Sequence, residues 1–206
     1  IGRLLRNSND FHVVCVRSTV PPGTVEELVV PILESGSGKR LERDFGVCLN
    51  PEFMREGSSI RDYYHPSMIV IGESDAPSGD RIASLYKDIE APVVRTSLRS
   101  AEMVKYVSNA FHALKVSFAN EIGNLSEQLG VNGHQVMEIF CRDRTLNLSA
   151  AYLKPGFAFG GSCLPKDVRA LNHEVRKHGL TSPVLASILP SNQNQIETVF
   201  NAIRTF

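Results

Sequence analysis

A single cysteine stands out in residues 157–171, which read FAFGGSCLPKDVRAL. Cys163 follows two glycines and a serine, and Lys166 and Asp167 lie within four residues of it. Because proline is favoured at the start of a helix, we expect a helix to begin at Pro165, with Cys163 at the approach to its amino end. Exposed N–H groups there, together with the ammonium group of Lys166, favour an anionic thiolate. This combination is typical of covalent chemistry at a carbonyl carbon.

The other three cysteines have apolar neighbours. Cys15 lies in VVCV, Cys48 lies in GVCL, and Cys141 follows EIF. We interpret all three as inert core residues, whereas the polar and glycine neighbours of Cys163 favour a reactive thiol over a structural one. No C-x-x-C spacing occurs, so neither a metal site nor a thioredoxin-like pair is expected. The pattern indicates a reducing, cytoplasmic setting.

Composition excludes several classes of partner. The 206 residues carry 22 Lys and Arg against 22 Asp and Glu, and such a balance does not favour nucleic acid. No apolar run approaches the roughly 20 residues that cross a bilayer. We therefore expect no nucleic-acid partner and no membrane partner.

The chain starts at Ile1 in what reads as the end of a helix, so we expect it to be part of a longer protein.

Residues 1–96 have α/β texture. Their apolar runs at 11–16, 45–49, 67–72 and 91–96 are rich in β-branched residues and predict buried, mostly parallel strands. The stretches GTVEELVVPILES and SGDRIASLYKDI predict helices between them. We expect a partial Rossmann-like sheet, with ligands beyond the carboxyl ends of its strands. No G-x-G-x-x-G occurs, so the usual pyrophosphate turn of a dinucleotide site would lie outside the chain.

Two predicted strands run into polar motifs. The first leads into RSTVPPG, which contains Thr19, and the second leads into NPEFMREG, which contains Glu52 and Glu56. A Ser-Thr pair before prolines also suits a simple turn or helix cap. Two glutamates four residues apart also suit a solvated helix face. Each motif is therefore a candidate site with a plain structural alternative.

Residues 97–206 read as almost entirely helical, with a break at 141–164 and one long helix over 100–130. That helix has an apolar stripe of Met103, Val107, Ala110, Phe111, Leu114, Phe118, Ile122 and Leu125. Its opposite face carries a narrow band of Lys105, Asn109, His112, Val116, Asn120 and Gly123. A band with one charge predicts a face covered by another element or by a ligand, and a polar seam against a neighbouring helix fits equally well. The helix is also long enough to be the axis of a dimer.

Four motifs together resemble the UDP-glucose/GDP-mannose dehydrogenase family. VRSTVPPGT, NPEFMREG, AEMVKYVSNAFHALKVSFANEIGNL and PGFAFGGSCLPKDVRAL occur in the family's order and span nearly the whole chain. The resemblance implies oxidation of the C6 alcohol of a nucleotide sugar to a carboxylate, with two NAD and one water, through a cysteine thiohemiacetal and thioester. Ala158 and His112 are most like the GDP-mannose branch, with UDP-glucose as the alternative substrate. Alginate-like or other surface polysaccharides would be the destination of the product.

The resemblance also implies catalytic roles. Cys163 would be the nucleophile, while Lys105 and Asn109 would orient the C6 oxygen and stabilise its charge. Asp167 and Thr19 would position the attacking water. The candidate general base would be Glu52, and Thr19 and Lys166 would approach the NAD.

Substrate contacts follow from the same motifs. They would be Glu56, Lys105, Asn109, His112, Asn120, Tyr152, Lys154, Phe157 and Gly160. AYLKPG departs from the family's GDP-mannose branch, which has two tyrosines and an arginine before PGFAFGG. Lys154 lacks the planar fork of an arginine, which bears on nucleotide affinity or base preference.

The resemblance places residues 1–96 in the back half of an NAD-binding domain and residues 97–206 in the helical central domain that dimerises in this family. The family's G-x-G turn and its carboxyl-terminal domain would lie outside the chain, so we expect a homodimer with little or no turnover by itself. Two other interpretations stay open. A hydroxyacid dehydrogenase of related architecture would use the K-x-x-x-N pair without a cysteine, and the chain could be a non-catalytic dimerisation module.

Overall fold

The computed structural model describes residues 1–144, 155–177, 179 and 182–204. Contacts divide the chain into two compact units, Ile1–Lys105 and Tyr106–Phe206. The first unit contains a sheet and short helices, and the second is helical in its described residues. The α/β class followed by a helical part is therefore confirmed. Within the described ranges, no helix is long and apolar enough to span a membrane.

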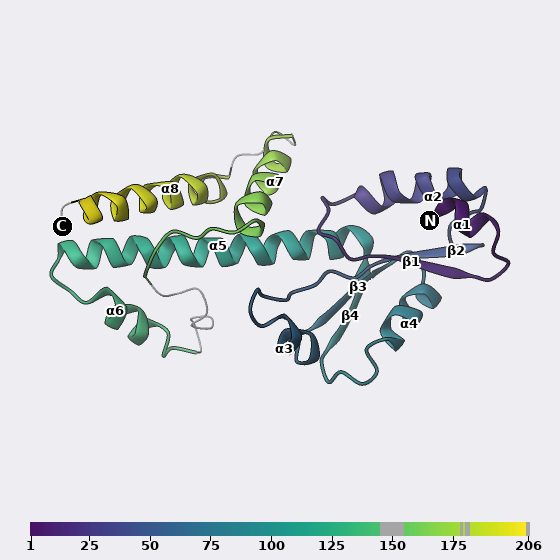
Figure 1. Cartoon of the computed structure of the whole chain (residues 1–206), viewed down its shortest axis with the longest axis horizontal. Helices are drawn as coiled ribbons and strands as arrows, with labels where there is room; N and C mark the ends of the chain where they lie inside the picture. The colour runs from purple at the N-terminus through teal and green to yellow at the C-terminus, as the bar shows by residue number, and fades with distance from the viewer. Residues whose placement is uncertain (145–154, 178, 180–181, 205–206) are drawn as a thin grey trace. The chain divides into compact units, whose positions relative to one another are not determined.

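The sheet of the first unit has four strands in the order β1-β2-β3-β4 (Figure 1). They are β1 (His12–Val16), β2 (Phe45–Leu49), β3 (Ile69–Glu73) and β4 (Val93–Ser97). The β1–β2 and β3–β4 pairs are parallel, whereas β2 and β3 pair antiparallel, so the sheet is mostly parallel as predicted. The bounds predicted for β2 are confirmed, and the other strands begin one or two residues later than predicted.

Only the central strands are as buried as the sequence predicted. β2 is buried throughout and β3 nearly so, whereas β1 is half-exposed and β4 largely exposed. The prediction of burial is wrong for these two strands because both lie at edges of this sheet, where fewer neighbours cover them.

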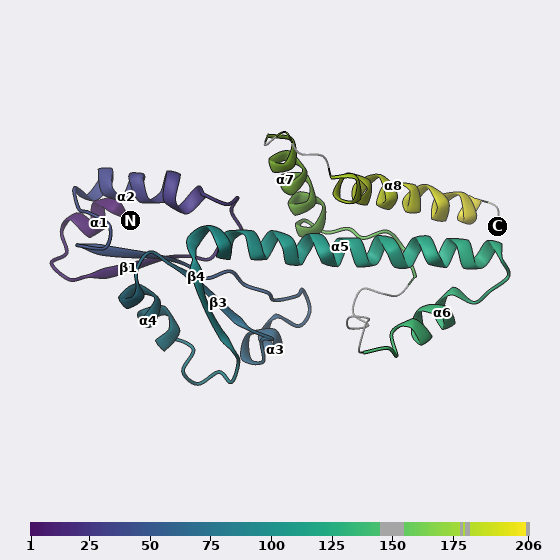
Figure 2. The same ribbon diagram turned by 180° about the vertical axis from the view of Figure 1, so that it is seen from behind.

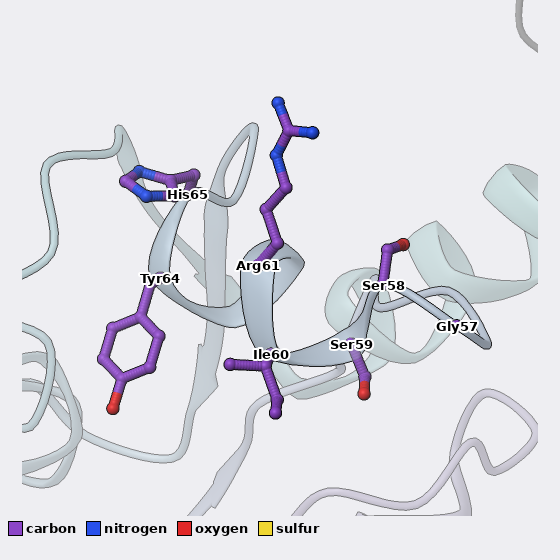
Figure 3. A pocket seen from close by; sticks show the side chains of 7 residues that line it. All are labelled: Gly57, Ser58, Ser59, Ile60, Arg61, Tyr64 and His65. Carbon is purple, nitrogen blue, oxygen red and sulfur yellow. The ribbon is translucent and has the colours of Figure 1, made fainter.

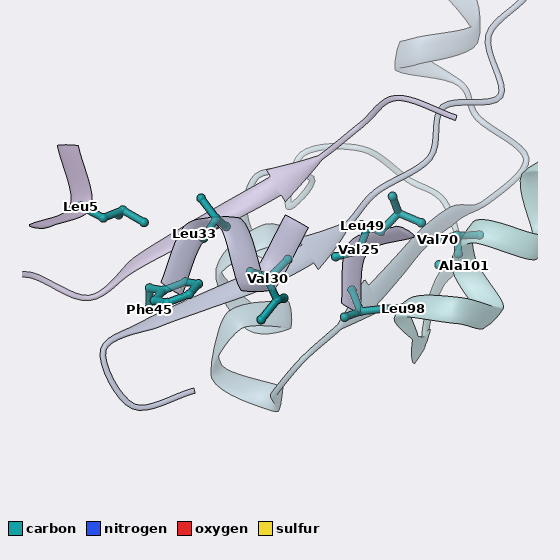
Figure 4. Packing of buried hydrophobic residues seen from close by; sticks show 10 residues of the cluster. Leu5, Val25, Val30, Leu33, Phe45, Leu49, Val70, Leu98 and Ala101 are labelled. Carbon is teal, nitrogen blue, oxygen red and sulfur yellow. The ribbon is translucent and has the colours of Figure 1, made fainter. Parts of the chain in front are cut away.

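Helices cover both faces of the sheet. One face holds α1 (Gly2–Arg6), the π-helical turn η1 (Val25–Val29) and α2 (Val30–Ser37), and the other holds α4 (Ala76–Ser84). Successive residues of β2 point to opposite faces, so Phe45, Val47 and Leu49 join the apolar cluster with η1 and α2, while Cys48 packs beneath α4. Figure 4 shows Phe45 and Leu49 within the first cluster. A short helix, α3 (Ser59–Tyr64), follows the loop after β2.

Both helices predicted in this unit form with shifted bounds: η1 and α2 together cover 25–37 where 23–35 was predicted, and α4 begins at Ala76, before the predicted start at Ser78. Pro31 does not interrupt the helical run because it lies where the π-helical turn η1 passes into α2, so the hydrogen-bond pattern changes at the residue that has no N–H to donate. The helix predicted over SGDRIASLYKDI ends at Ser84, and turns follow it.

The second unit packs helices against α5 (Leu98–Gln128), which begins in the first unit. Its other helices are α6 (Gly133–Phe140), α7 (Cys163–Lys177) and α8 (Pro183–Arg204). Figures 1 and 2 show α7 and α8 on one side of α5 and α6 on the other. One apolar cluster joins α5, α7 and α8 around Ala110, Val168 and Ile188, and a smaller one joins α5 to α6 through Ala119 and Met137.

The two faces of α5 differ in an unexpected way. Asn109 and Asn120 on the polar band are buried, so the prediction that this face is covered is confirmed. Four residues of the apolar stripe are exposed by more than a third: Met103, Val107, Phe111 and Phe118. The side chain of Leu125 lies outside the described residues. The helix therefore covers its amides and exposes much of its apolar surface.

Candidate active site

In the first unit, the carboxyl ends of β1 and β2 meet because these strands are parallel. The backbone N–H of Asn50 donates to the carbonyl of Val16 at 2.9 Å, which joins the two loops where the strands end. Thr19 lies in the loop after β1 and is half-buried. This edge is where open α/β sheets bind dinucleotides, so a half-buried hydroxyl there suits a contact with NAD.

Glu52, in the loop after β2, pairs with Lys105 of α5. The Oε1 atom of Glu52 lies 3.2 Å from Nζ of Lys105, and its Oε2 accepts from the N–H of Met54 at 2.7 Å. Lys105 is buried, and its Nζ lies 5.5 Å from the ring centroid of Phe53. The first unit thus places a candidate base beside a candidate oxyanion-binding cation. The ammonium group stabilises negative charge, and the carboxylate can accept a proton.

In the second unit, Asn109 of α5 donates from Nδ2 to Oδ2 of Asp167 on α7. Asp167 is 1% exposed. Its Oδ1 lies 3.5 Å from Nζ of Lys166 and makes no hydrogen bond to any described residue. A buried carboxylate oxygen with unused acceptor capacity is suited to holding a water molecule or a substrate hydroxyl.

Cys163 is the first residue of α7. The prediction that it precedes the helix is therefore wrong by two residues. Pro165 is the third helical residue, and its missing N–H costs nothing because no N–H in the first turn has a partner within the helix. Cys163 is exposed, and its Sγ lies 3.7 Å from Oγ of Ser162. Residues three and four apart share a helix face, so Cys163, Lys166 and Asp167 lie on one face of α7, with Cβ atoms about 5–6 Å apart.

The three remaining cysteines, unlike Cys163, pack in or against apolar clusters. Burial raises the pKa of Cys48 to about 12, and burial also raises the pKa of Cys15. Both side chains lie in or against the apolar cluster under α4, which supports their interpretation as inert core residues. Cys141 packs against the α5–α6 cluster.

The predicted substrate contacts have varied surroundings. Glu56, Phe157 and Gly160 are exposed, and His112 is half-buried. Tyr152 and Lys154 lie outside the described residues. Asn120 is buried and spends its amide on backbone: Oδ1 accepts from the N–H of Gly156 at 2.7 Å, and Nδ2 donates to the carbonyl of Phe157 at 3.2 Å.

Two functional candidates on α8 escaped the sequence analysis. Asn192 accepts from the N–H of Phe159 at 2.8 Å and donates to its carbonyl at 2.9 Å. Gln195 donates from Nε2 to the carbonyl of Gly156 at 2.6 Å. Both side chains are buried. The amide-rich run SNQNQ was the available signal, but a run of amides on a helix also reads as a solvated face.

A third missed residue lies in the first unit. Glu102, on α5, accepts hydrogen bonds from the backbone N–H groups of Gly23 and Val25 at 2.5 and 2.9 Å. Its side chain is 1% exposed, and burial raises its pKa although both N–H groups lower it. Glu102 thereby fixes the turn that follows Thr19.

A hollow of about 800 Å³ lies on α3 and the residues before it (Figure 3). It is lined by Gly57, Ser58, Ser59, Ile60, Arg61, Tyr64 and His65. Figure 3 shows that these side chains fan out around the helix and do not converge on one point. Although the hollow follows Glu56 directly in sequence, it is not a built binding site.

Comparisons with known proteins agree with these features. Residues 1–90 match the NAD binding domain of the UDP-glucose/GDP-mannose dehydrogenase family, and residues 99–194 match its central domain. The chain is 51% identical over 206 residues to GDP-mannose 6-dehydrogenase of Pseudomonas syringae pv. tomato, covering 100% of the chain and 47% of that relative. The chain therefore spans about half the length of the curated relatives it matches.

Solved structures give the same result. A ternary complex of GDP-mannose dehydrogenase from Pseudomonas aeruginosa superposes with a TM-score of 0.71 at 49% identity, covering 100% of this chain and 47% of that chain. A UDP-glucose dehydrogenase from Pyrobaculum islandicum gives a TM-score of 0.88 at 40% identity, covering 94% of this chain and 44% of that chain. The chain belongs to the UDP-glucose/GDP-mannose dehydrogenase family.

Proposed function

We propose that the complete protein oxidises the C6 alcohol of GDP-mannose to a carboxylate. The observation that carries the proposal is the arrangement on α7, where an exposed Cys163 shares a helix face with the buried carboxylate of Asp167, itself bonded to Asn109. A dehydrogenase that stopped at an aldehyde or ketone would need no nucleophile there. NAD, when bound, accepts a hydride from C6 in each of two oxidations, and Thr19 and Lys166 are the proposed contacts to it.

The first oxidation converts the alcohol to an aldehyde. The C6 hydroxyl loses its proton and C6 loses a hydride. Lys105 and Asn109, one turn apart on α5, orient the C6 oxygen and stabilise the charge that develops on it. The proposed substrate contacts, including Glu56, His112, Phe157 and Gly160 as well as Tyr152 and Lys154, hold the nucleotide sugar during this step.

The second oxidation is covalent. The thiolate of Cys163 adds to the aldehyde carbon, which forms a C–S bond and leaves an oxyanion. Loss of a second hydride from C6 then gives a thioester. The thiohemiacetal, which forms before the second hydride is lost, keeps the aldehyde from leaving between the two oxidations.

Hydrolysis completes the reaction. Glu52 takes a proton from water that Asp167 and Thr19 position, and the hydroxide adds to the thioester carbon. The C–S bond breaks, Cys163 leaves as a thiolate, and the carboxylate is released. In total, one alcohol and one water yield one carboxylate, two hydrides and three protons.

The branch within the family rests on similarity. Identity is 49% to the GDP-mannose dehydrogenase structure and 40% to the UDP-glucose dehydrogenase structure, which favours GDP-mannose. UDP-glucose is the second candidate because that structure superposes with the higher TM-score. The departure from the GDP-mannose branch at AYLKPG is where a different preference for the nucleotide base, guanine or uracil, would arise.

The test is the NADH formed per mole of nucleotide sugar by the complete protein, with GDP-mannose and UDP-glucose in parallel. We expect two NADH per GDP-mannose and little from UDP-glucose. Two NADH per UDP-glucose, with none from GDP-mannose, would support the proposed chemistry and contradict the assignment of GDP-mannose as the substrate. One or none from either sugar would overturn the cysteine mechanism and would revive a one-hydride hydroxyacid dehydrogenase. The 206-residue chain alone is expected to show little or no turnover.

We also propose a homodimer through α5. Met103, Val107, Phe111 and Phe118 lie on one side of this helix with more than a third of each side chain exposed. A second copy is the occupant that buries the same stripe on both partners. Light scattering should report a dimer, and a monomeric mass would refute this role of α5. The exposed thiol of Cys163 fits a reducing compartment such as the cytoplasm.

A further inference from the structure

The backbone of residues 156–159 lies outside regular secondary structure. It crosses α5 closely, because a Cβ added at Gly123 would lie 2.5 Å from Cβ of Pro155. N–H and C=O groups in such a segment have no partners within a helix or a sheet, yet buried ones need partners. Side chains or water must therefore supply them.

Three buried amides supply these partners from two helices. Asn120 of α5 and Gln195 of α8 bind Gly156 and Phe157, and Asn192 of α8 binds Phe159. Together they pair five backbone groups: the N–H and C=O of Gly156, the C=O of Phe157, and the N–H and C=O of Phe159. The amide of Asn192 pairs with both the N–H and the C=O of Phe159, as the backbone of a neighbouring strand would do in a sheet.

The segment held in this way leads into the candidate nucleophile. Phe159 anchors its ring in the cluster of α5, α7 and α8, whereas Phe157 is 64% exposed. Four residues after Phe159, Cys163 opens α7. A fixed backbone lets the exposed ring and the cysteine keep set positions without an ordering cost when ligand binds.

We propose that Asn192 and Gln195 are positioning residues for the nucleotide-sugar site: they fix the backbone of residues 156–159 so that Phe157 and Gly160 meet the substrate in a preformed geometry. This inference rests on the proposed function. It assigns neither residue a contact with substrate. It predicts that replacing either residue raises KM for the nucleotide sugar more than KM for NAD.

The test compares Asn192→Leu with Asn194→Leu in the complete protein. Leucine is close in shape to asparagine and removes both hydrogen bonds to Phe159 without adding charge, and Asn194 is exposed two residues away. We expect Asn192→Leu to raise KM for GDP-mannose about tenfold or more, since small misplacements of positioning groups have large kinetic effects. KM for NAD should stay within about twofold in both variants, because the segment at residues 156–159 is proposed to meet the nucleotide sugar and not NAD. A general loss of fold would instead change the KM values of both substrates together.

Gln195→Met provides a second variant that removes one hydrogen bond and keeps the length of the side chain. It carries the test if Asn192→Leu does not fold, with the same split between KM values expected at smaller size. Folded variants whose KM for GDP-mannose equals that of Asn194→Leu would overturn the inference. The wild-type arm separates the two claims: a wild-type protein that forms no NADH from GDP-mannose contradicts the proposed function, whereas a normal wild-type with unaffected variants contradicts only the positioning role.

Discussion

The turn at residues 21–25, which leads into η1, in the first unit and the irregular segment at residues 156–159 in the second are both stretches of backbone held by buried side chains. A single carboxylate, Glu102, holds the turn by accepting from the N–H groups of Gly23 and Val25. Three amides hold the segment by both accepting and donating. The two solutions use different functional groups for the same task.

The sequence of each stretch explains the difference. Pro21 and Pro22 have no N–H, and the carbonyl of Pro21 already accepts from Thr24, so the turn offers donors at Gly23 and Val25 that need acceptors. A carboxylate has only acceptors and fits them. The segment at residues 156–159 offers both N–H and C=O groups, and only an amide pairs with both. Carboxylate and amide should therefore not be interchangeable at these sites.

The largest expected effect comes from Asn192→Asp, which puts a carboxylate where a donor is needed. A carboxylate oxygen would face the carbonyl of Phe159, and the loss of free energy of unfolding should be about 3 kcal/mol, as for a buried charged group without its hydrogen bond. Urea unfolding of the complete protein measures this. Asn194→Asp, an exposed match, should change stability by less than about 0.5 kcal/mol. Equal values for the two variants would contradict the amide requirement.

Glu102→Gln is the reverse exchange and should have an intermediate effect. The new NH₂ group would face a backbone N–H, leaving a buried donor unpaired at a cost of about 1–3 kcal/mol. Glu27→Gln is the control, since Glu27 also links to α5, through Arg99, but lies exposed. Hydrogen exchange should accelerate at residues 21–25 in Glu102→Gln and stay unchanged at residues 156–159. Acceleration at both stretches would show that the two regions are not independent.

The smallest expected effect is a pH dependence. Because burial raises the pKa of Glu102 above that of an unfolded glutamate, the folded state keeps this proton to higher pH. The stability that the proton contributes is full below the unfolded pKa and is lost as pH rises through the folded one. Glu102→Gln lacks this titration, so its deficit against wild type should shrink as pH rises. Parallel urea-unfolding curves across pH would contradict the burial argument.

The sequence predicted those parts of the molecule whose signal is local and periodic. The bounds of β2 and the length of α5 followed from apolar runs and from a pattern sustained over about 30 residues. The exposure of β1 and β4 did not follow, because burial of a strand depends on neighbours that its own residues do not specify. The predicted start of α7, Pro165, lies two residues after the observed start at Cys163, because proline is tolerated throughout the first helical turn and so does not mark its first residue.

The candidate site divided in the same way. Cys163, Asp167 and Asn109 were named from motifs, whereas the hydrogen bond between the last two was not predicted and became visible only in the structure. Asn192 and Gln195 were missed because their backbone partners lie 33 and 39 residues away in a stretch without periodicity. Glu102 was missed because a glutamate on a helix usually faces solvent, and only its two N–H partners distinguish it.

The most direct test of the account is the yield of carboxylate from GDP-mannose by the Cys163→Ser variant of the complete protein, beside wild type and Cys141→Ser. Wild type and Cys141→Ser should convert the C6 alcohol fully to the acid. Cys163→Ser should form none, because without the thiolate no thioester can be hydrolysed. A normal yield of acid from Cys163→Ser would contradict the covalent mechanism, and with it the role assigned to the start of α7.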